Sequence, residues 1–122
     1  MAPYSCFYFT TESGDSPVER FIDSLDYKTQ RKFFFKKDLL QEFGPRLPYP
    51  HAKRIGDDIY ELRFEGIEGS IRVLYFFFYK NEIIFTNGFI KKSNRTPKRE
   101  KELALERRRL FLSRKGELKW ER

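Results

Sequence analysis

Cysteine and histidine are almost absent from this chain, which holds one of each, Cys6 and His51, among 122 residues. A single cysteine excludes an intrachain disulfide and is typical of a protein kept in a reducing compartment. A zinc site built from thiolates and imidazoles is disfavoured as well, so we expect no metal and no cofactor. Cys6 lies in a β-rich segment, which favours a buried structural thiol over a nucleophile.

Long apolar runs are also missing. No segment approaches the ~20 apolar residues that a membrane-spanning helix needs, and the N-terminus lacks the basic and then apolar pattern of a signal peptide. We therefore expect a cytoplasmic protein with no membrane partner. The chain also has no Walker loop and no Gly-Xaa-Ser-Xaa-Gly nucleophile elbow, so neither of these hydrolase motifs accounts for its function.

Aromatic and charged residues dominate what is present. Aromatic residues form 18% of the chain, with 14 Phe and 7 Tyr, and charged residues form 35%. The core must therefore be built largely from rings beneath an ionic surface. The length predicts one domain over residues 1–122, with a flexible tail over about 113–122. Two interpretations stay open for Trp120 in this tail: it stacks on a nucleobase, or it caps the last helix.

A strand over residues 4–10 and two helices are predicted for the first third of the chain. Ser16-Pro17-Val18-Glu19 has the pattern of a capping box with proline at the first helical position. The second helix covers residues 26–43, and Gly44-Pro45 ends it. Its apolar stripe is predicted to comprise Phe35, Leu39 and Phe43, beside Phe33 and Leu40.

A loop over residues 46–56 is predicted to lead into three antiparallel strands. These strands cover residues 59–65, 70–79 and 82–90, and the first alternates cleanly between apolar and charged side chains. A last helix runs from Pro97 to about residue 112, with Leu103, Leu110 and Phe111 facing inward. The predicted fold class is α+β: an N-terminal strand, two helices, a three-stranded antiparallel meander and a C-terminal helix.

Positive charge is concentrated near the C-terminus. Residues 91–115 hold eleven Lys or Arg and three Glu, a net charge of +8, whereas the rest of the chain has a net charge of −1. Residues 88–99 end an apolar strand in a group of cations and then begin the last helix at Thr96-Pro97. Such asymmetry indicates a nucleic-acid partner. A solvated basic helix that merely aids solubility is the alternative.

Arg63, Arg72, Lys91 and Lys92 are the candidate catalytic residues. Arg63 and Arg72 lie on neighbouring predicted strands, and the two lysines end the third strand. Guanidinium forks bind phosphate oxygens in pairs, and such a surface suits RNA cleavage without a metal. In that reaction the ribose 2′-OH attacks the adjacent phosphate, Arg stabilises the charged transition state, and Lys or Tyr moves the protons.

Further side chains are assigned as a possible general base, as nucleic-acid contacts or as ion-pair partners. His51 is a possible general base, because an imidazole titrates near neutrality. The predicted nucleic-acid contacts are Lys53, Arg95, Lys98 and Arg99. In the alternative structural interpretation, Arg63 pairs with Glu61 or Glu65, and Arg72 pairs with Glu82 or another acid. A metal-dependent nuclease, built on Asp57 or Asp58 with Glu61-Leu62-Arg63, is a third hypothesis.

Three motifs carry a family resemblance. Residues 59–63 (Ile-Tyr-Glu-Leu-Arg), residues 72–75 (Arg-Val-Leu-Tyr) and residues 88–92 (Gly-Phe-Ile-Lys-Lys), the last ahead of Thr96-Pro97 and Glu100, resemble the HigB-type, phage-derived branch of the RelE toxin superfamily. The motif spacing and the order of elements agree with that branch. The resemblance covers nearly the whole chain except the last several residues.

The resemblance implies a RelE-like fold and the toxin of a type II toxin–antitoxin system, an enzyme that cuts mRNA, usually on the ribosome. Its expected partners are mRNA, the ribosome and a cognate helix-turn-helix antitoxin similar to HigA. By position, Arg63, Arg72, Lys91 and Lys92 become the phosphate-binding and catalytic candidates, whereas the family pattern has no firm counterpart for His51. The competing hypothesis is a binding module that holds RNA or a protein on the same basic face without cleavage.

Overall fold

A computed structural model describes residues 2–120, with side chains described as far as Arg114. Its centre is a five-stranded sheet in the order β1-β5-β4-β3-β2. The strands are β1 (Ser5–Tyr8), β2 (Ala52–Gly56), β3 (Ile59–Gly66), β4 (Gly69–Phe78) and β5 (Glu82–Lys91). The helices are α1 (Pro17–Asp23), α2 (Tyr27–Phe43), the short 3-10 helix η1 (Gly44–Arg46) and α3 (Lys98–Trp120). β1 runs parallel to β5, and the other neighbours are antiparallel.

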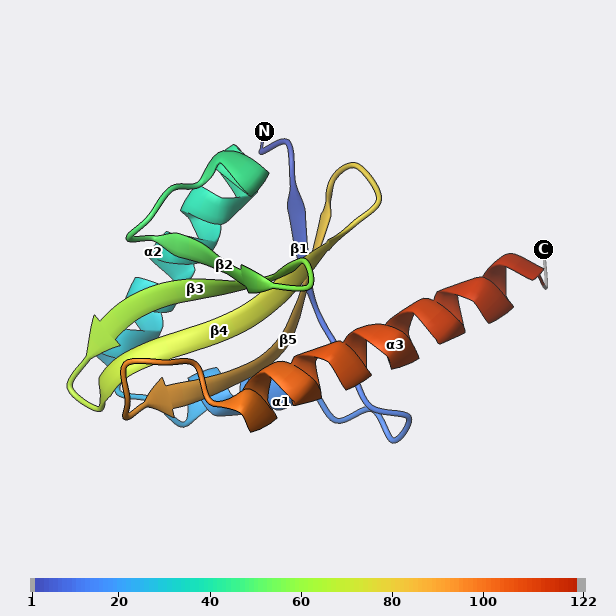
Figure 1. The fold of residues 1–122 in the computed structure, drawn as a ribbon. Helices are drawn as coiled ribbons and strands as arrows, with labels where there is room; N and C mark the ends of the chain where they lie inside the picture. Colours follow the sequence, from blue (N-terminus) through green and yellow to red (C-terminus); the bar gives the residue numbers. More distant parts are fainter. Residues whose placement is uncertain (1, 121–122) are drawn as a thin grey trace.

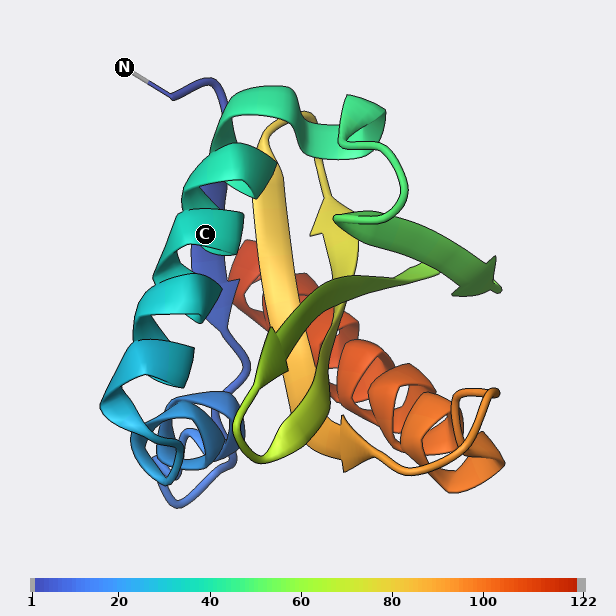
Figure 2. The same ribbon diagram turned by 90° about the vertical axis from the view of Figure 1, so that its left-hand side faces the viewer.

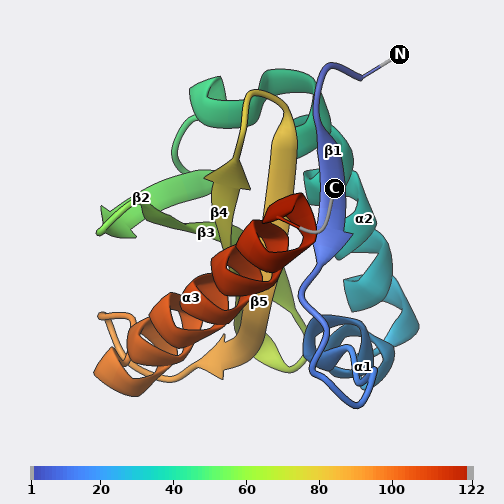
Figure 3. The same ribbon diagram turned by 90° about the vertical axis from the view of Figure 1, so that its right-hand side faces the viewer.

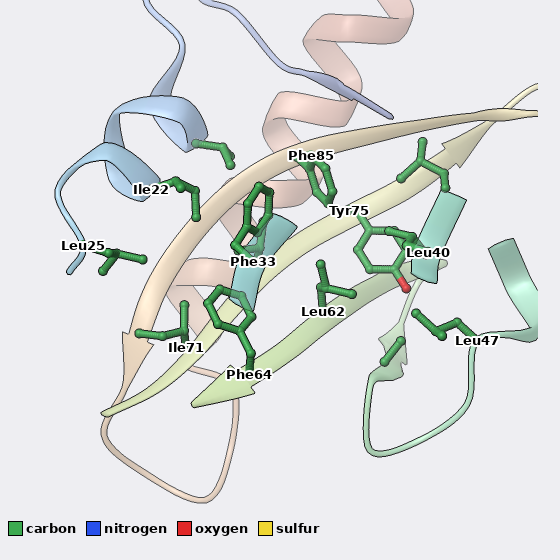
Figure 4. Close-up of a cluster of buried hydrophobic side chains, with 14 residues drawn as sticks. Ile22, Leu25, Phe33, Leu40, Leu47, Leu62, Phe64, Ile71, Tyr75 and Phe85 are labelled. Atoms are coloured by element: carbon green, nitrogen blue, oxygen red, sulfur yellow. The ribbon is translucent and has the colours of Figure 1, made fainter. Parts of the chain in front are cut away.

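Helices cover both faces of the sheet. α1 and α2 pack on one face, and α3 crosses the other (Figures 1, 2 and 3). The larger core lies under α1 and α2, where Phe33, Phe64 and Phe85 meet, and Figure 4 shows these rings together. The smaller core lies under α3, around Phe76 and Ala104. No helix in the described part of the chain is long and apolar enough to cross a membrane.

The predicted α+β fold class and order of elements are confirmed. β4 is buried on both faces along most of its length, because it lies in the middle of the sheet between β3 and β5. β3 places Leu62 and Phe64 in the larger core as predicted, but Glu61 on its charged face is buried as well. Gly44 ends α2 in a left-handed conformation, φ 55°, which a residue without a Cβ adopts most easily.

The predicted loop over residues 46–56 was wrong in its second half. Ala52–Gly56 forms β2, which pairs antiparallel with β3, so the meander has four strands. Pro48 and Pro50 suggested irregular structure, but both precede this edge strand. The pairing reaches Leu62, and one further hydrogen bond joins the Arg63 N–H to the His51 carbonyl, 2.9 Å. Residues 63–66 of β3 therefore lie beyond the pairing with β2.

The predicted apolar stripe of α2 was right for Phe33, Leu40 and the partly buried Leu39, and wrong for Phe35 and Phe43. The buried positions are Thr29, Phe33 and Leu40, spaced by four and seven residues on one helical face. Phe35 lies two residues beyond Phe33, about 200° round the helix, and 61% of its surface is exposed. Phe43 is exposed as well, so α2 carries aromatic side chains toward solvent as well as toward the core.

The last helix also departs from its prediction. Ala104 is the residue buried against the sheet, whereas Leu103 is exposed, and Leu110 and Phe111 are partly buried as expected. The helix continues to Trp120 rather than ending near residue 112. Residues 121–122 of the predicted tail and the side chain of Trp120 lie outside the described residues.

The predicted capping box at α1 is made in part. Pro17 begins α1 and Ser16 is its N-cap, as expected. The Ser16 hydroxyl donates to the Glu19 carboxylate, 2.7 Å, but the side chain makes no capping bond to a backbone N–H.

Candidate functional site

Strand register brings the basic side chains onto one part of the sheet. Arg63 on β3 is the direct partner of Arg72 on β4, and Lys91 ends β5 opposite Ser70. Arg63 and Arg72 alternate with residues buried in the larger core, so they start from the opposite face of the sheet, which α3 crosses. In Figure 1 the segment between β5 and α3 borders this part of the sheet beside the β3–β4 hairpin. Cations from three strand segments, Arg63 on β3, Arg72 on β4 and the adjacent Lys91 and Lys92 at the end of β5, can therefore meet here.

The result is a groove of about 350 Å³, here called the anion groove. It is lined by Arg63, Ser70, Arg72, Lys91, Lys92, Ser93 and Asn94. All four predicted catalytic residues are in this set. The described lining consists of cationic and neutral polar side chains and contains no carboxylate. Such a set attracts an anion and supplies hydrogen-bond donors, which is what a phosphate group requires.

Arg72 lies deepest in the anion groove. Only 5% of its surface is exposed, and its Nη1 donates to the Ile71 carbonyl at 3.0 Å. Its buried Nε–H finds no hydrogen-bond partner among the described residues. Burial lowers the pKa of the guanidinium, and the nearby Arg63 charge acts in the same direction. This Nε lies 3.7 Å from the buried Glu61 Oε2, longer than a hydrogen bond, so Arg72 offers the groove its positive charge rather than this buried donor.

Glu61 is the residue that the sequence interpretation underestimated. Its carboxylate is 1% exposed, and Oε2 lies 2.5 Å from Arg63 Nη1 and 3.7 Å from Arg72 Nε. Oε1 accepts a hydrogen bond from the Thr96 hydroxyl, 2.8 Å, which ties the segment before α3 to the sheet. The expected pairing of Arg63 with Glu61 is therefore present. One buried carboxylate holds two guanidiniums beside the groove.

Of the two partners expected for Arg72, Glu82 is wrong and the alternative, another acid, is confirmed. Arg72 pairs with Glu61 and Glu65, the latter at 3.7 Å, and not with Glu82. Glu82 is paired with Phe78 at the opposite end of β4, because the antiparallel register places the start of β5 beside the end of β4. The strand register, which the sequence did not reveal, therefore decides which acids lie near Arg72.

A second groove of about 330 Å³ adjoins the anion groove and shares Lys91 and Asn94 with it. Lys53 and Arg95, two of the predicted nucleic-acid contacts, line this second groove. Lys98 and Arg99 are exposed in the first turn of α3 and are not among the described side chains that line either groove. The structure thus gathers two of these four predicted contacts near the candidate catalytic residues.

Lys91 joins the two grooves and has an unusual environment. Burial lowers the pKa of its ammonium group, and the cations Arg72, Arg63 and Lys53 lower it further, while Glu61 opposes them. A lysine whose pKa is lowered gives up a proton more easily near neutral pH than an exposed lysine does. Lys91 therefore combines a position in the anion groove with an ammonium group whose pKa is lowered.

His51 contacts α2 and the backbone of β3. Its Nδ1 is 2.7 Å from the Nζ of Lys36 on α2, and its carbonyl accepts the Arg63 N–H. His51 is not among the described residues that line the anion groove. An ammonium group has no lone pair, so Lys36 donates and the Nδ1 of His51 accepts.

The acidic residues of the metal-nuclease hypothesis are used in ion pairs. Asp57 pairs with Lys101 and Asp58 with Arg54, each at 2.9 Å. Across the described residues, no group of three His, Cys, Asp or Glu side chains is placed to hold a metal ion.

Cys6 is partly buried, and burial raises the pKa of its thiol to about 12, which suits a structural role.

Comparison with known proteins adds the family. A search of curated proteins gives no match for this chain. The model of the phage-derived Gp49-like proteins (DUF891) matches residues 20–109, which hold the β2–β5 sheet, both grooves and all the candidate site residues. This family is a RelE/toxin-like group. Because the match covers most of the chain, this protein belongs to the phage-derived Gp49-like family.

Proposed function

We propose that this protein is the toxin of a type II toxin–antitoxin system, of the HigB type, and that it cleaves mRNA on the ribosome without a metal ion. Membership of a RelE/toxin-like family supports the toxin role. The observation that carries the enzymatic role is the anion groove, where Arg63, Arg72, Lys91 and Lys92 meet with no carboxylate in the described lining. Such a lining favours direct phosphate binding over a metal bridge.

The chemistry is transesterification by the substrate's own ribose. The 2′-oxygen attacks the adjacent phosphorus, the bond to the 5′-oxygen of the next nucleotide breaks, and a 2′,3′-cyclic phosphate forms. The five-coordinate intermediate carries extra negative charge on its non-bridging oxygens. Arg72 and Arg63, both beside Glu61 and both lining the anion groove, supply positive charge for those oxygens.

One proton must leave the 2′-OH and one must reach the departing 5′-oxygen. Lys91 is the favoured group for proton transfer, because it lines the groove and has a lowered pKa. Lys92 adds charge at the exposed rim. His51 stays an alternative general base, and its contact with Lys36 sets it apart from the groove.

A toxin of this kind needs an inhibitor, and toxin-like family membership supports an antitoxin partner. We propose a helix-turn-helix antitoxin similar to HigA, encoded beside this gene. The same basic face accounts equally for a module that binds RNA or a protein without cutting. The proposal and this alternative differ in whether a phosphodiester bond is broken.

The test is cleavage of an mRNA held on purified ribosomes, with Arg63→Ala, Arg72→Ala and Lys80→Ala compared with the original chain. We expect cuts in the ribosomal A site and a loss of at least about a hundredfold in rate for either groove variant, as for removal of one transition-state donor. Lys80→Ala, the matched loss of one exposed charge at the β4–β5 turn, keeps the rate. Free RNA with EDTA, at high enzyme concentration, tests the need for metal.

Three results would overturn the proposal. Tight ribosome or RNA binding without any cut supports the binding module instead. Cleavage that EDTA abolishes on free RNA supports a metal-dependent nuclease. Equal loss of rate in Lys80→Ala and Arg63→Ala would remove the anion groove as the site.

A further inference from the structure

A third groove lies between α2 and the part of β3 beyond its pairing with β2. Its volume is about 420 Å³, and we call it the edge groove. It is lined by Lys32, Phe35, Lys36, Pro50, Arg63, Phe64 and Glu65. Three cations, one carboxylate and three apolar side chains meet there, which differs from the wholly polar lining of the anion groove.

Exposed rings mark this part of the surface. Phe35 has 61% of its surface exposed and Tyr49, next to Pro50, has 65% exposed. Neither ring is needed in the core, where Phe33 and Leu40 already fill the inner face of α2. The Arg63 guanidinium lies over the Tyr49 ring, 4.9 Å from its centroid. Exposed aromatic faces beside cations are the elements with which proteins bind single-stranded nucleic acid.

Arg63 connects the edge groove to the anion groove, because it lines both. The pairing with β2 reaches only Leu62, so the edge of β3 opposite β4 carries no paired strand along residues 63–66. In Figure 2, α2 lies beside β3 on the side away from α3. A strand of RNA bound at the anion groove can therefore continue past Arg63 into the edge groove.

The cations of the edge groove are held in place. Lys32 Nζ donates to the Glu65 carbonyl at 2.8 Å, and Lys36 Nζ lies 2.7 Å from His51 Nδ1. Both contacts restrain long side chains before a ligand binds. Binding therefore costs less of their rotamer entropy. The groove is therefore preorganised for an anionic group next to an apolar one.

We propose that the edge groove binds one nucleotide of single-stranded RNA next to the phosphate held in the anion groove, with the base against Phe35 and the flanking phosphate near Lys36 and Arg63. The identification of the ligand as RNA rests on the proposed function. A nucleotide fits the combination of ring and cations, and the shared Arg63 gives continuity with the phosphate site. A protein segment is the other class of occupant, and the experiment separates the two.

The experiment measures binding by fluorescence anisotropy of short single-stranded RNAs with a 2′-deoxy sugar at the scissile position, so that none is cut. Phe35→Ala is compared with Phe34→Ala, the adjacent ring on α2, which is 46% exposed and not among the described edge-groove residues. We expect about a tenfold loss of affinity for Phe35→Ala, because base–aromatic stacking is typically of this size, and little change for Phe34→Ala. The salt dependence of binding stays the same in both variants, since neither changes a charge.

Abasic substitution identifies the base. An RNA without a base at one position should bind the original chain as weakly as the intact RNA binds Phe35→Ala, and Phe35→Ala should weaken that abasic RNA no further. Equal affinities for Phe35→Ala and the original chain would overturn the proposal. The proposal would also be overturned if Phe35→Ala bound RNA normally and lost only its binding to the co-expressed antitoxin. Binding that depends on Phe35 without any ribosomal cleavage leaves the edge groove assigned and removes the enzymatic proposal alone.

Discussion

Glu61 decides how the candidate site is built at the scale of single residues. A buried carboxylate between Arg63 and Arg72 offsets the repulsion of two guanidiniums that neighbouring strands bring together. It also accepts a hydrogen bond from Thr96, which holds the segment that carries Ser93 and Asn94 near the groove. The arginines are thus in position before an anion arrives, which is the condition for effective electrostatic catalysis.

Glu61→Gln should therefore destabilise the protein. Breaking a buried ion pair typically costs about 3 kcal/mol in the free energy of unfolding, because the remaining charges stay buried without compensation. Urea unfolding measures this cost, and added sulfate should recover part of it in the variant by replacing the missing negative charge. The control is Glu65→Gln, since Glu65 is exposed and its pairing is screened by water. Equal stability of the two variants would contradict a structural role for the Glu61 charge.

Contacts between elements set the position of the β3–β4 hairpin. Glu68 in the turn accepts hydrogen bonds from the Asp26 N–H, 2.5 Å, and from the Thr29 hydroxyl, 2.8 Å, both at the start of α2. Because the turn is attached to this helix end, the hairpin that carries Arg63 and Arg72 is fixed relative to α2 and the edge groove. These hydrogen bonds, the Asp26 N–H first, lower the pKa of the Glu68 carboxyl below its usual 4.5.

The lowered pKa predicts a pH-dependent contribution of Glu68. A carboxyl whose folded-state pKa is depressed stabilises the fold fully above its unfolded-state pKa, and this contribution is lost as pH falls through the folded-state value. The free energy of unfolding of the original chain should therefore exceed that of Glu68→Gln at neutral pH. The difference should shrink below a pH of about 4.5 and vanish in stronger acid. Urea unfolding at several pH values measures it, and a difference that does not vary with pH would refute the assignment.

Gly88 shows that part of the family-like motif at the end of β5 serves packing between elements. A Cβ at this position would lie 2.5 Å from the ring of Phe21 on α1, much closer than atoms approach one another in proteins. Gly88 therefore lets α1 approach the sheet. The following residues, Lys91 and Lys92, carry the charge of the same motif into the anion groove.

The whole molecule has a net charge of +7, and its excess charge comes from the segment that includes the end of β5 and most of α3. RNA binding should therefore weaken strongly as salt increases. Lys92→Ala should reduce the slope of log affinity against log salt by about 0.7, the value for one lost contact with a single-stranded phosphate. Anisotropy titrations over a series of salt concentrations measure this slope.

Lys80→Ala provides the matched comparison for that titration. It removes the same charge from an exposed position at the β4–β5 turn, and Lys80 is not among the described lining of any of the three grooves. Its slope should equal that of the original chain. Equal losses in the two variants would show that only net charge matters, and the anion groove would then have no special part in RNA binding.

Much of the fold followed from the sequence, because its signals are local. Alternation of apolar and charged side chains located β3, Gly44-Pro45 marked the end of α2, and strand order along the chain favoured the antiparallel meander. Errors arose where a local pattern has two solutions. The rings at Phe33 and Phe35 are equally apolar, and only packing against the sheet decides which one is buried.

By itself, the sequence determined the α+β fold class, the concentration of positive charge and the candidate residues Arg63, Arg72, Lys91 and Lys92. Tertiary structure alone decided that these four side chains share one groove, that Glu61 is buried between two of them, and that β2 stops short of the edge groove. The physical reason is that residue type and periodicity act within a few positions of the chain, whereas strand register and burial depend on residues that are distant in sequence.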